Sequence, residues 1–489
     1  MICVPIAGPS MGRALADIAS AAPVADIIEL RLDMIDEFDL PRLLKATRKP
    51  CIVTNRTKRE GGQFKGTDEE RVRILRQAME AGADYIDIET STPRELLKPV
   101  LENKGGTQVI LSYHNFTNTP DDLDPFYETM CDLPADVIKI ATYAQHLSDN
   151  LKMFRLLERA RRENRKLIAL CMGEKGEISR VLSPLMGAFL TFGSLETGKE
   201  TAPGQIPAST LKHVYRADQS RPDFKVYGVI GNPVSKSMGY LIHNRAFLEI
   251  GSPDIYVSFL VENVEQFFAD FQDLFQGLSV TMPFKVDVIP LMDQVDGAAR
   301  KIGAVNTVVK TEAGWMGYNT DRTGALRALE GHVDLNGKNV LIIGAGGTAK
   351  AIGHGVIERG GRLTVTYNRN RDRGEQLADE LHCGLIPIRE AGGVPIDVLI
   401  NCSPVGMSPN VDDTPFPSRN LKKGMVVFDA VYNPPETRLL REAMEKGCTA
   451  ISGVELFINQ AAAQFELWTG KKAPVYAMRQ VLMKKIQGK

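Results

Sequence analysis

The chain has 489 residues, of which 43% are hydrophobic, and its 59 Lys and Arg against 60 Asp and Glu give a formal net charge of -1. At roughly 100–200 residues per domain this length predicts about three domains, and the balanced charge offers no basic surface for a nucleic-acid partner. No apolar run is long enough to cross a membrane, no basic leader precedes an apolar core at Met1, and the seven cysteines form no CxxC pair, so we expect a cytoplasmic protein with reduced thiols.

Strand-like and helix-like stretches alternate from residue 1 to about residue 215. The stretches between strands, such as Asp68–Ala81 and Asp149–Arg165, have the composition and length of helices. Eight β/α repeats predict an α/β fold that begins with a (β/α)8 barrel, whose reacting groups lie at the C-terminal ends of the strands. The eight strand-like runs are Ile2–Ala7, Ile27–Asp33, Cys51–Arg56, Tyr85–Thr90, Gln108–Phe116, Val137–Tyr143, Leu167–Gly173 and Phe189–Gly193.

Charged side chains gather where these predicted strands end. Glu29 and Arg31 alternate and therefore share one face of the second run. After the eighth run comes a loop, Glu196 to Pro207, which is long enough to act as a lid. The other candidates are Arg56 on the third run, Asp87 and Glu89 on the fourth, His114 on the fifth, Lys139 on the sixth and Arg180 after the seventh.

Lys139 lies between two isoleucines of the sixth run. Burial and the charge of the nearby arginines would disfavour its ammonium form and leave a free amine, which can form an imine with a ketone. Taken alone, Lys139 could also be a non-catalytic lysine whose amine reaches water from a strand end. His114 alone could be a hydrogen-bonded histidine of the core. Together, and with arginines around them, they predict a Schiff-base lyase or aldolase that acts on an anionic keto acid.

Five motifs follow one another in this half: Glu29–Asp33 (ELRLD), Asn55–Gly62 (NRTKREGG), Ser112–Phe116 (SYHNF), Val137–Ala141 (VIKIA) and Ala202–Gln205 (APGQ). In these motifs the half resembles the type I 3-dehydroquinate dehydratases over its whole length. The resemblance implies that Lys139 forms the imine with the C3 ketone, and that His114 takes the C2 proton and helps the C1 hydroxyl to leave as water. It implies that Thr201, where the family often has serine, keeps its contact, and that the other substrate-binding residues are Glu29, Arg31, Arg56, Arg180 and Gln205.

The second half follows a polar linker between His213 and Phe224. Its strand-like run Lys338–Ile343 leads into Gly344-Ala345-Gly346-Gly347-Thr348-Ala349 and then a helical stretch, Lys350–Arg359. This is the GxGxxA form of the dinucleotide-binding turn, in which the glycines allow a tight turn and the helix N-terminus faces the diphosphate.

The next run, Leu363–Tyr367, ends in Asn368-Arg369 and not in the acidic residue that binds the ribose 2′-hydroxyl of NAD. Arg369, with Arg371 close by, can pair with a 2′-phosphate, so the sequence predicts NADP as the cofactor. The alternative is a solvated basic strand end.

A third group of polar residues precedes this turn. Lys285 follows a strand-like run, Asn306 lies in Gly303–Thr307, and Asp321 ends Gly317–Asp321. Asn306 alone fits a turn residue and Asp321 the N-cap of the helix that starts at Arg322. A Lys–Asp pair beside a nicotinamide can move a hydroxyl proton while hydride moves to or from the cofactor.

With further motifs at Gly231–Val234, His243-Asn244, Asn401–Met407, Asp429–Pro434, Gly453 and Gln460, the second half resembles the shikimate dehydrogenases. The resemblance implies Lys285 and Asp321 as the catalytic pair. It places Cys402–Met407 on the nicotinamide side and implies a substrate site of Ser237, Thr281, Asn306, Tyr432 and Gln460. The cofactor residues it implies are Gly344, Ala345, Gly346, Gly347, Thr348, Ala349, Asn368, Arg369 and Gly453, and it implies no metal.

One segment departs from that family. The usual His-Ser-x-Ser-Pro is Lys236-Ser237-Met238-Gly239-Tyr240 here, so a carboxylate-binding serine is replaced by Gly239. Loss of that hydroxyl costs on the order of 1–3 kcal/mol of binding, which the charge of Lys236 could offset. The choice between shikimate and quinate therefore stays open.

The sequence thus predicts a bifunctional shikimate-pathway enzyme that makes 3-dehydroshikimate and reduces it with NADPH. We expect a barrel over 1–218, a substrate-binding domain over 224–325 completed by helices of 454–489, and a Rossmann domain over 326–453. The partners we expect are small-molecule substrates; the oligomeric state stays open, with a monomer compatible. Two rivals are a non-catalytic sensor on the same folds, which would not need Lys139, His114, Lys285 and Asp321, and an aldolase barrel joined to a quinate-type dehydrogenase.

Overall fold

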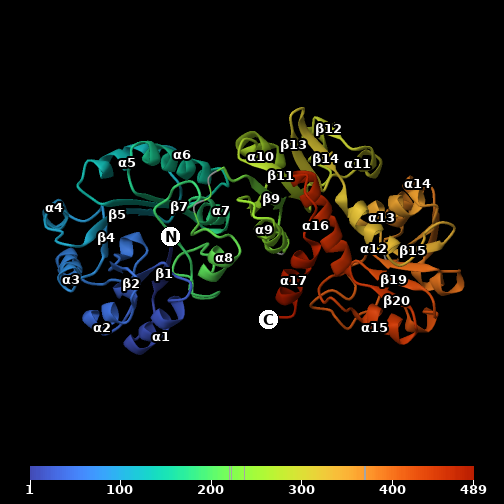
Figure 1. Cartoon of the computed structure of the whole chain (residues 1–489), viewed down its shortest axis with the longest axis horizontal. Coiled ribbons are helices and arrows are strands. Elements are labelled where there is room, and N and C mark those ends of the chain that lie inside the picture. The colour runs from blue at the N-terminus through green and yellow to red at the C-terminus, as the bar shows by residue number, and fades with distance from the viewer. Residues whose placement is uncertain (220, 222, 236, 368–369, 489) are drawn as a thin grey trace. The chain divides into compact units, whose positions relative to one another are not determined.

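The structure of the protein is a computed structural model that describes residues 1–219, 221, 223–235, 237–367 and 370–488. The chain divides into two compact units, Met1–Asp223 and Phe224–Lys489. Within the described residues, no helix combines the length and the apolar composition needed to cross a membrane. Each unit is built around parallel β-structure, as Figure 1 shows.

The first unit is an eight-stranded parallel barrel, which confirms the predicted fold. Its strand order is β7-β6-β5-β4-β3-β2-β1-β8, with β1 paired to both β2 and β8. The eighth strand is shorter than the sequence predicted. The strands are β1 (Ile2–Ile6), β2 (Ile27–Arg31), β3 (Cys51–Thr54), β4 (Tyr85–Glu89), β5 (Gln108–Asn115), β6 (Val137–Tyr143), β7 (Leu167–Met172) and β8 (Thr191–Phe192).

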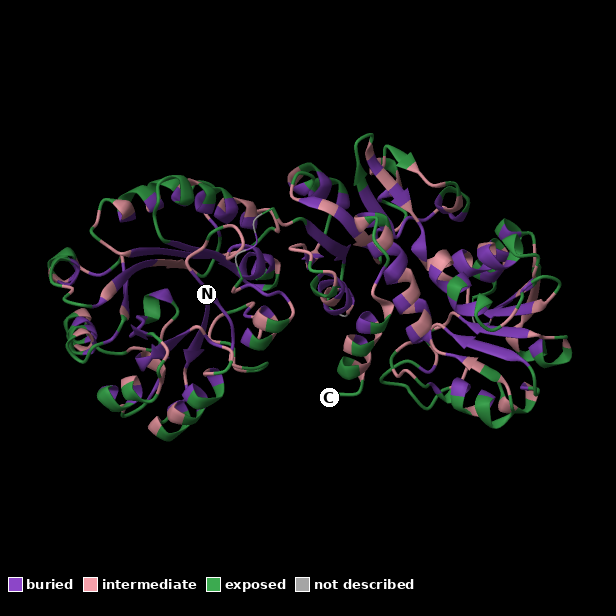
Figure 2. Ribbon diagram, viewed as in Figure 1, coloured by how far each residue is buried: buried purple, intermediate pink, exposed green. Residues whose placement is uncertain are grey.

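Helices cover the outside of these strands, and the strands themselves are almost wholly buried (Figure 2). Helix α3 shows why the chain turns helical where it does: Thr67 and Glu70 form a capping box, and Val72, Leu75 and Ala78 form its buried face. The helices are α1 (Met11–Ala21), α2 (Leu40–Lys45), α3 (Asp68–Glu80), α4 (Arg94–Glu102), α5 (Asp124–Cys131), α6 (Asp149–Arg162), α7 (Glu177–Leu182) and α8 (Ala208–His213).

The second unit begins with a mixed six-stranded sheet in the order β10-β9-β11-β13-β14-β12. Its first three strands are parallel and pair through β9, while β13 runs antiparallel to β11 and β14. Helices α9 (Gly239–Glu249), α10 (Val264–Phe271) and α11 (Gly297–Ile302) belong to this part. Its strands are β9 (Val226–Gly231), β10 (Ile255–Leu260), β11 (Phe275–Val280), β12 (Gln294–Val295), β13 (Thr307–Thr311) and β14 (Gly314–Tyr318).

A parallel six-stranded sheet follows, in the order β17-β16-β15-β18-β19-β20, with strand order reversing at β15 as in a Rossmann fold. Its main helices are α13 (Gly347–Glu358), α14 (Arg371–Leu381) and α15 (Arg438–Glu445). The strands are β15 (Asn339–Ile343), β16 (Arg362–Tyr367), β17 (Gly384–Pro387), β18 (Val398–Asn401), β19 (Val426–Asp429) and β20 (Thr449–Ile451).

Two helices join the sheets of the second unit. Helix α12 (Thr320–Glu330) leads from the first sheet to the second, and α16 (Gly453–Thr469) packs along it. A Cβ on Gly324 would lie 2.6 Å from the backbone nitrogen of Gln460, so glycine is needed for this close approach. Helix α17 (Val475–Ile486) then packs on α9, so the C-terminal helices return to the first sheet.

Candidate active sites

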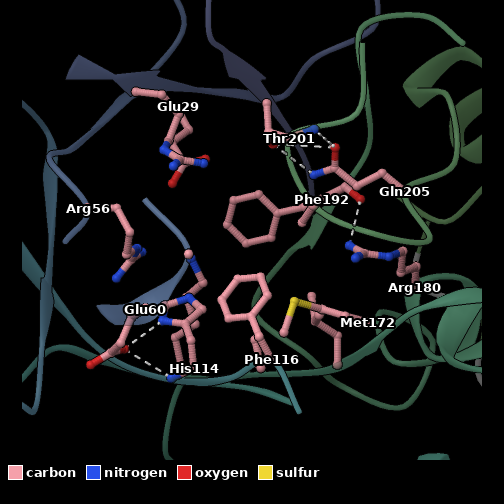
Figure 3. Close-up of a pocket in the computed structure, with 16 residues that line it drawn as sticks. Glu29, Arg56, Glu60, His114, Phe116, Met172, Arg180, Phe192, Thr201 and Gln205 are labelled. Carbon is pink, nitrogen blue, oxygen red and sulfur yellow. Dashed lines mark hydrogen bonds and ion pairs between the residues drawn. The ribbon is translucent and has the colours of Figure 1, made fainter. Parts of the chain in front are cut away.

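One pocket at the C-terminal ends of the barrel strands collects every residue that sequence analysis assigned to the first site (Figure 3). Those residues are Glu29, Arg31, Arg56, His114, Lys139, Arg180, Thr201 and Gln205. Sequence analysis missed Glu60, Phe116, Met172 and Phe192, which also line this pocket. Glu60 lies inside a motif quoted above, but nothing in the sequence indicated that it contacts His114. Apolar residues that line a pocket cannot be distinguished by sequence from apolar residues of the core.

Lys139 is buried, and its side-chain nitrogen lies 2.9 Å from Oδ2 of Asp87. The same nitrogen lies 4.4 Å from the ring centroid of Phe192. A free amine was expected here from burial and the nearby arginines; the structure adds a carboxylate in direct contact with the lysine. This contact is an ion pair between two buried side chains.

Asp87 also binds Arg56, whose Nη2 atom lies 2.9 Å from the same carboxylate oxygen. Burial alone would raise the pKa of Asp87, but the charges of Arg56 and Lys139 outweigh it and hold the pKa well below its usual range. Arg56 in turn lies 3.1 Å from Glu89, which forms a buried ion pair with Arg71 of α3. Alternating charges therefore run from the helix layer to Lys139.

His114 forms a pair with Glu60 (Figure 3). The Nδ1 atom lies 3.0 Å from Oε2 of Glu60, which also accepts the backbone N–H of His114 at 3.1 Å. Burial, and then the charges of Arg56 and Lys139, lower the pKa of His114 well below its usual value. A neutral imidazole that donates from Nδ1 to a carboxylate keeps Nε2 as an acceptor, which suits a general base.

Arg180 is the clearest candidate for an anion-binding group. Its guanidinium is buried and donates to the carbonyl oxygen of Pro203 at 2.9 Å, and within the described part of the chain no carboxylate lies within ion-pair distance of it. Burial lowers the pKa of Arg180 to about 10. A buried cation without a carboxylate partner is costly, so an anionic ligand would relieve it.

The remaining predicted side chains are held by neighbours. Nε2 of Gln205 donates to the hydroxyl of Thr201 at 3.2 Å, and this contact joins the two ends of the segment 201–205. Arg31 donates to both oxygens of Asp33, at 2.9 and 2.8 Å. Glu29 accepts the hydroxyl of Thr54 at 2.7 Å. Such contacts restrict the rotamers of these side chains before any ligand binds.

In the second unit, Nζ of Lys285 lies 2.5 Å from Oδ2 of Asp321. Lys285 follows β11, and Asp321 lies in the first turn of α12. Sequence analysis left open that Asp321 is the helix N-cap; the cap is Asn319, whose side chain accepts the N–H of Arg322 at 3.3 Å. The carboxylate of Asp321 is therefore available for the lysine.

The residues predicted to bind substrate in this unit surround the pair only in part. Asn306 is buried, and its Oδ1 accepts the N–H of Thr320 at 2.7 Å, which fixes the start of α12. Tyr432 stacks on Phe457, and Gln460 donates to the carbonyl oxygen of Phe457 at 3.2 Å. Across the described residues, no hydrogen bond joins Ser237, Thr281 or Tyr432 directly to Lys285 or Asp321.

The segment that departs from the family pattern is only partly visible. Lys236 lies outside the described residues, so the charge expected there is not placed. A Cβ on Gly239 would lie 3.0 Å from the hydroxyl of Tyr256. That hydroxyl donates to Ser279 at 2.7 Å, which restricts its movement.

The glycine turn after β15 has the shape that a dinucleotide needs. Gly344 has φ 106°, and a Cβ on it would lie 3.0 Å from the carbonyl carbon of Cys402. By contrast, a Cβ on Gly346 or Gly347 would meet no protein atom within 4 Å, so this side of the turn is open where α13 begins. Backbone N–H groups at such a helix start favour a diphosphate.

Of the other residues predicted to bind the cofactor, some lie outside the described residues and others are held by contacts within the protein. Asn368 and Arg369 lie outside the described residues, and Arg371 pairs with Glu375 at 2.7 Å. Ala349 is buried. A Cβ on Gly453 would lie 2.4 Å from the carbonyl oxygen of Val431, so packing alone requires glycine there.

Comparison with known proteins gives matches along the whole chain. The Type I 3-dehydroquinase family matches residues 2–222, the Shikimate dehydrogenase substrate binding domain 229–308, the Shikimate / quinate 5-dehydrogenase family 325–399, and the Shikimate 5'-dehydrogenase C-terminal domain 453–483. A bifunctional 3-dehydroquinate dehydratase/shikimate dehydrogenase of Arabidopsis thaliana, described as chloroplastic, is 38% identical over 99% of this chain and 84% of its own length.

Two further relatives cover different parts of the chain. The shikimate biosynthesis protein AroDE of Chlamydia pneumoniae is 32% identical over 96% of this chain and 95% of its own length. A crystal structure of a shikimate dehydrogenase in complex with NADP+ is 33% identical, covers 54% of this chain and 96% of its own, and superposes with a TM-score of 0.51.

Proposed function

The chain belongs to the family of bifunctional 3-dehydroquinate dehydratase/shikimate dehydrogenases, and on that premise we propose which of its residues carry out each reaction. The first half dehydrates 3-dehydroquinate to 3-dehydroshikimate, and the second half reduces 3-dehydroshikimate to shikimate with NADPH. We assign the dehydratase to residues 1–218, the dehydrogenase substrate domain to 224–325 with 454–489, and the NADP domain to 326–453.

In the dehydratase, Lys139 is the nucleophile. Its amine adds to the C3 ketone, and loss of water gives an imine that withdraws electrons from C2. Nε2 of His114 then takes the C2 proton, the C1–O bond breaks, and the leaving hydroxyl departs as water with that proton. Hydrolysis of the imine returns Lys139 and releases the enone product. The observation that carries this proposal is that Lys139, His114 and Arg180 line one pocket, and that Arg180 has no carboxylate partner among the described residues.

Arg180 is the residue we assign to the substrate carboxylate, since it is the buried cation of this pocket that lacks an acidic partner. Glu29, Arg31 and Arg56 are fixed by their own contacts and are assigned to the hydroxyl groups. Thr201 and Gln205 belong to the loop after β8 and are assigned to closure over the ligand. In this assignment, rigid residues near the strand ends bind the substrate, and the loop that contains Thr201 and Gln205 closes over it.

In the dehydrogenase, Lys285 donates the proton that converts the substrate carbonyl into a hydroxyl group, and Asp321 positions it. When bound, NADPH supplies the hydride that reduces the carbonyl carbon. Asn306, Thr281, Ser237, Gln460 and Tyr432 are assigned to the substrate. Asn306 is suited to position the ring because its amide oxygen is fixed by α12, as described above.

The glycine turn Gly344–Ala349 is assigned to the diphosphate of NADP, because the helix start is open at Gly346 and Gly347, which leaves room for that group. Arg369 is assigned to the 2′-phosphate and Asn368 to the adjacent ribose, on the sequence argument. Gly453 is assigned to cofactor binding, although its packing against Val431 already explains the glycine.

The experiment that tests both halves is a steady-state assay of the purified chain with 3-dehydroquinate, run with NADPH, with NADH and without cofactor. We expect the conjugated enone to form without cofactor, and shikimate to form preferentially with NADPH. Borohydride added with 3-dehydroquinate should attach substrate covalently to wild type and not to Lys139→Ala. Lys285→Ala should abolish nucleotide oxidation and leave enone formation intact. Enone formation by Lys139→Ala at the wild-type rate would refute the assignment of the lysine.

A further inference from the structure

Glu60 is shared by two partners on opposite sides of its carboxylate. Oε2 binds the backbone and side chain of His114, while Oε1 accepts a hydrogen bond from the hydroxyl of Ser91 at 2.5 Å. Glu60 is buried, whereas Ser91 is an exposed residue in the turn that follows β4. A surface hydroxyl therefore contacts the carboxylate that orients the base of the dehydratase.

We propose that Ser91 is a positioning residue for the dehydration step, holding Glu60 as the ionised acceptor that keeps the imidazole of His114 in its reactive tautomer. The proposal rests on the dehydratase function proposed above. Ser91 is not among the residues that line the pocket, so its effect passes through Glu60 to His114.

The tautomer matters because Glu60 can serve His114 in only one protonation state. An ionised carboxylate accepts from Nδ1–H and leaves the lone pair of Nε2 free to take a proton. A protonated Glu60 would donate to Nδ1 instead, and Nε2 would then carry a hydrogen and could not act as a base. The imidazolium formed after proton transfer also needs the negative charge of Glu60 beside it.

The surroundings of Glu60 make its ionisation sensitive to one hydrogen bond. Burial raises the pKa of Glu60, and the negative charge of Glu89 on β4 acts in the same direction. Three neighbours act against this: the hydroxyl of Ser91, the charge of Arg56 after β3, and the backbone N–H of His114 on β5. Arg56 is already bound to Asp87 and Glu89, so it cannot move closer to Glu60 to replace a lost hydroxyl.

The geometry of Ser91 allows a clean substitution. Because the residue is exposed and lies in a turn, removal of its hydroxyl leaves no cavity and unpairs no group other than Glu60. Threonine at this position keeps a hydroxyl on the same Cβ. The dehydrogenase half of the same chain serves as an internal control for concentration and folding.

The test is the pH dependence of dehydratase kcat and kcat/KM for wild type, Ser91→Ala and Ser91→Thr, from about pH 5 to 9, where the acid limb reports the His114–Glu60 pair. For Ser91→Ala we expect the acid limb to move up by about one pH unit, which lowers kcat about tenfold on that limb. On the alkaline plateau kcat should stay within about twofold of wild type, and KM should change little. Ser91→Thr should restore the wild-type profile.

Glu60→Gln supplies the second arm, because a neutral amide has no ionisation for Ser91 to control. In that background Ser91→Ala should shift nothing further. An unchanged acid limb in Ser91→Ala would overturn the proposal, and so would a uniform loss of activity at every pH or an equal shift in the Glu60→Gln background. If wild type itself lacked dehydratase activity, the proposed function would fail instead, so the two failures are distinguishable.

Discussion

Lys139 and Arg56 bind the same carboxylate oxygen, with a nitrogen of each 2.9 Å from Oδ2 of Asp87. This places two cations and one anion in a buried site formed by β4, β6 and the segment after β3. The residue proposed above as the nucleophile of the dehydratase is therefore held by Asp87, a residue that was noted from the sequence but given no role. Its removal should therefore affect both stability and catalysis.

Asp87→Asn keeps the shape of the side chain and removes its charge, which leaves Lys139 and Arg56 facing each other. We expect the barrel to lose about 3–5 kcal/mol of unfolding free energy, because one partner of a buried ion pair is removed. Dehydratase kcat should fall while dehydrogenase activity stays at the wild-type level. Circular dichroism during urea unfolding, together with the two activity assays, measures this. If Asp87→Asn had the same stability and the same dehydratase rate as wild type, the role of Asp87 would be contradicted.

Gly344 and Gly346, two glycines of the dinucleotide-binding turn, should respond differently to substitution by alanine. Gly344→Ala places a Cβ where φ is 106° and the backbone of Cys402 is 3.0 Å away, so it should lower stability by about 1–3 kcal/mol as well as weaken NADPH binding. Gly346→Ala meets no protein atom and should leave the melting temperature close to wild type.

For Gly346→Ala we nevertheless expect the KM for NADPH to rise at least about tenfold, because the new methyl group points into the space assigned to the diphosphate. Thermal unfolding and NADPH titration of both variants test this difference. If Gly346→Ala bound NADPH as tightly as wild type, the diphosphate could not bind on this side of the turn.

Gly239 offers a test of substrate preference. Gly239→Ser should lower the KM for shikimate by at least about threefold, because a new hydrogen bond to a carboxylate outweighs the displacement of Tyr256. Gly239→Ala adds the same Cβ without the hydroxyl and is the matched control, which should not lower KM. Kinetics of both variants with shikimate and with quinate are the measurement. An equal gain for both variants, or none for serine, would show that this position does not contact the carboxylate.

Buried His243 predicts how the second unit responds to acid. Burial lowers its pKa to about 3, against a side-chain hydrogen bond to Gln464 that raises it. The unfolded chain has a histidine pKa near 6.5, so the unfolded state binds the proton first. The stability that depends on this group is thus complete above about pH 6.5 and is lost as pH falls from there toward about 3, with about 2 kcal/mol lost by pH 5.

His243→Phe keeps a ring against Tyr256 and Trp468 and should remove this part of the pH dependence. Both tryptophans of the chain, Trp315 and Trp468, lie in the second unit, so tryptophan fluorescence during urea unfolding reports that unit alone. His332→Phe, at an exposed position, is the control and should keep the wild-type slope. The same slope in wild type and His243→Phe would refute the assignment to His243.

The architecture and the chemical class of the site residues could both be predicted from local patterns in the sequence. Alternating strand-like and helix-like runs predicted the barrel and the Rossmann sheet, because periodicity and glycine placement are local properties of the chain. Strand-end positions, together with the resemblance to the dehydratases, named eight residues of the first site, and all eight line one pocket. The pair Lys285 and Asp321 was predicted in the same way and lies in direct contact.

Which charged side chains contact one another could be learned only from the folded chain. Glu60 and His114 are 54 residues apart, and Asp87 and Lys139 are 52 apart, so no local pattern indicates that they pair. The free amine expected at Lys139 followed from burial and from arginines that the sequence could name. That Asp87, which lies two strands away in the sheet, contacts this lysine became known only from the fold. Electrostatic effects depend on distance and burial, and both are set by how the strands pack and not by the order of residues along the chain.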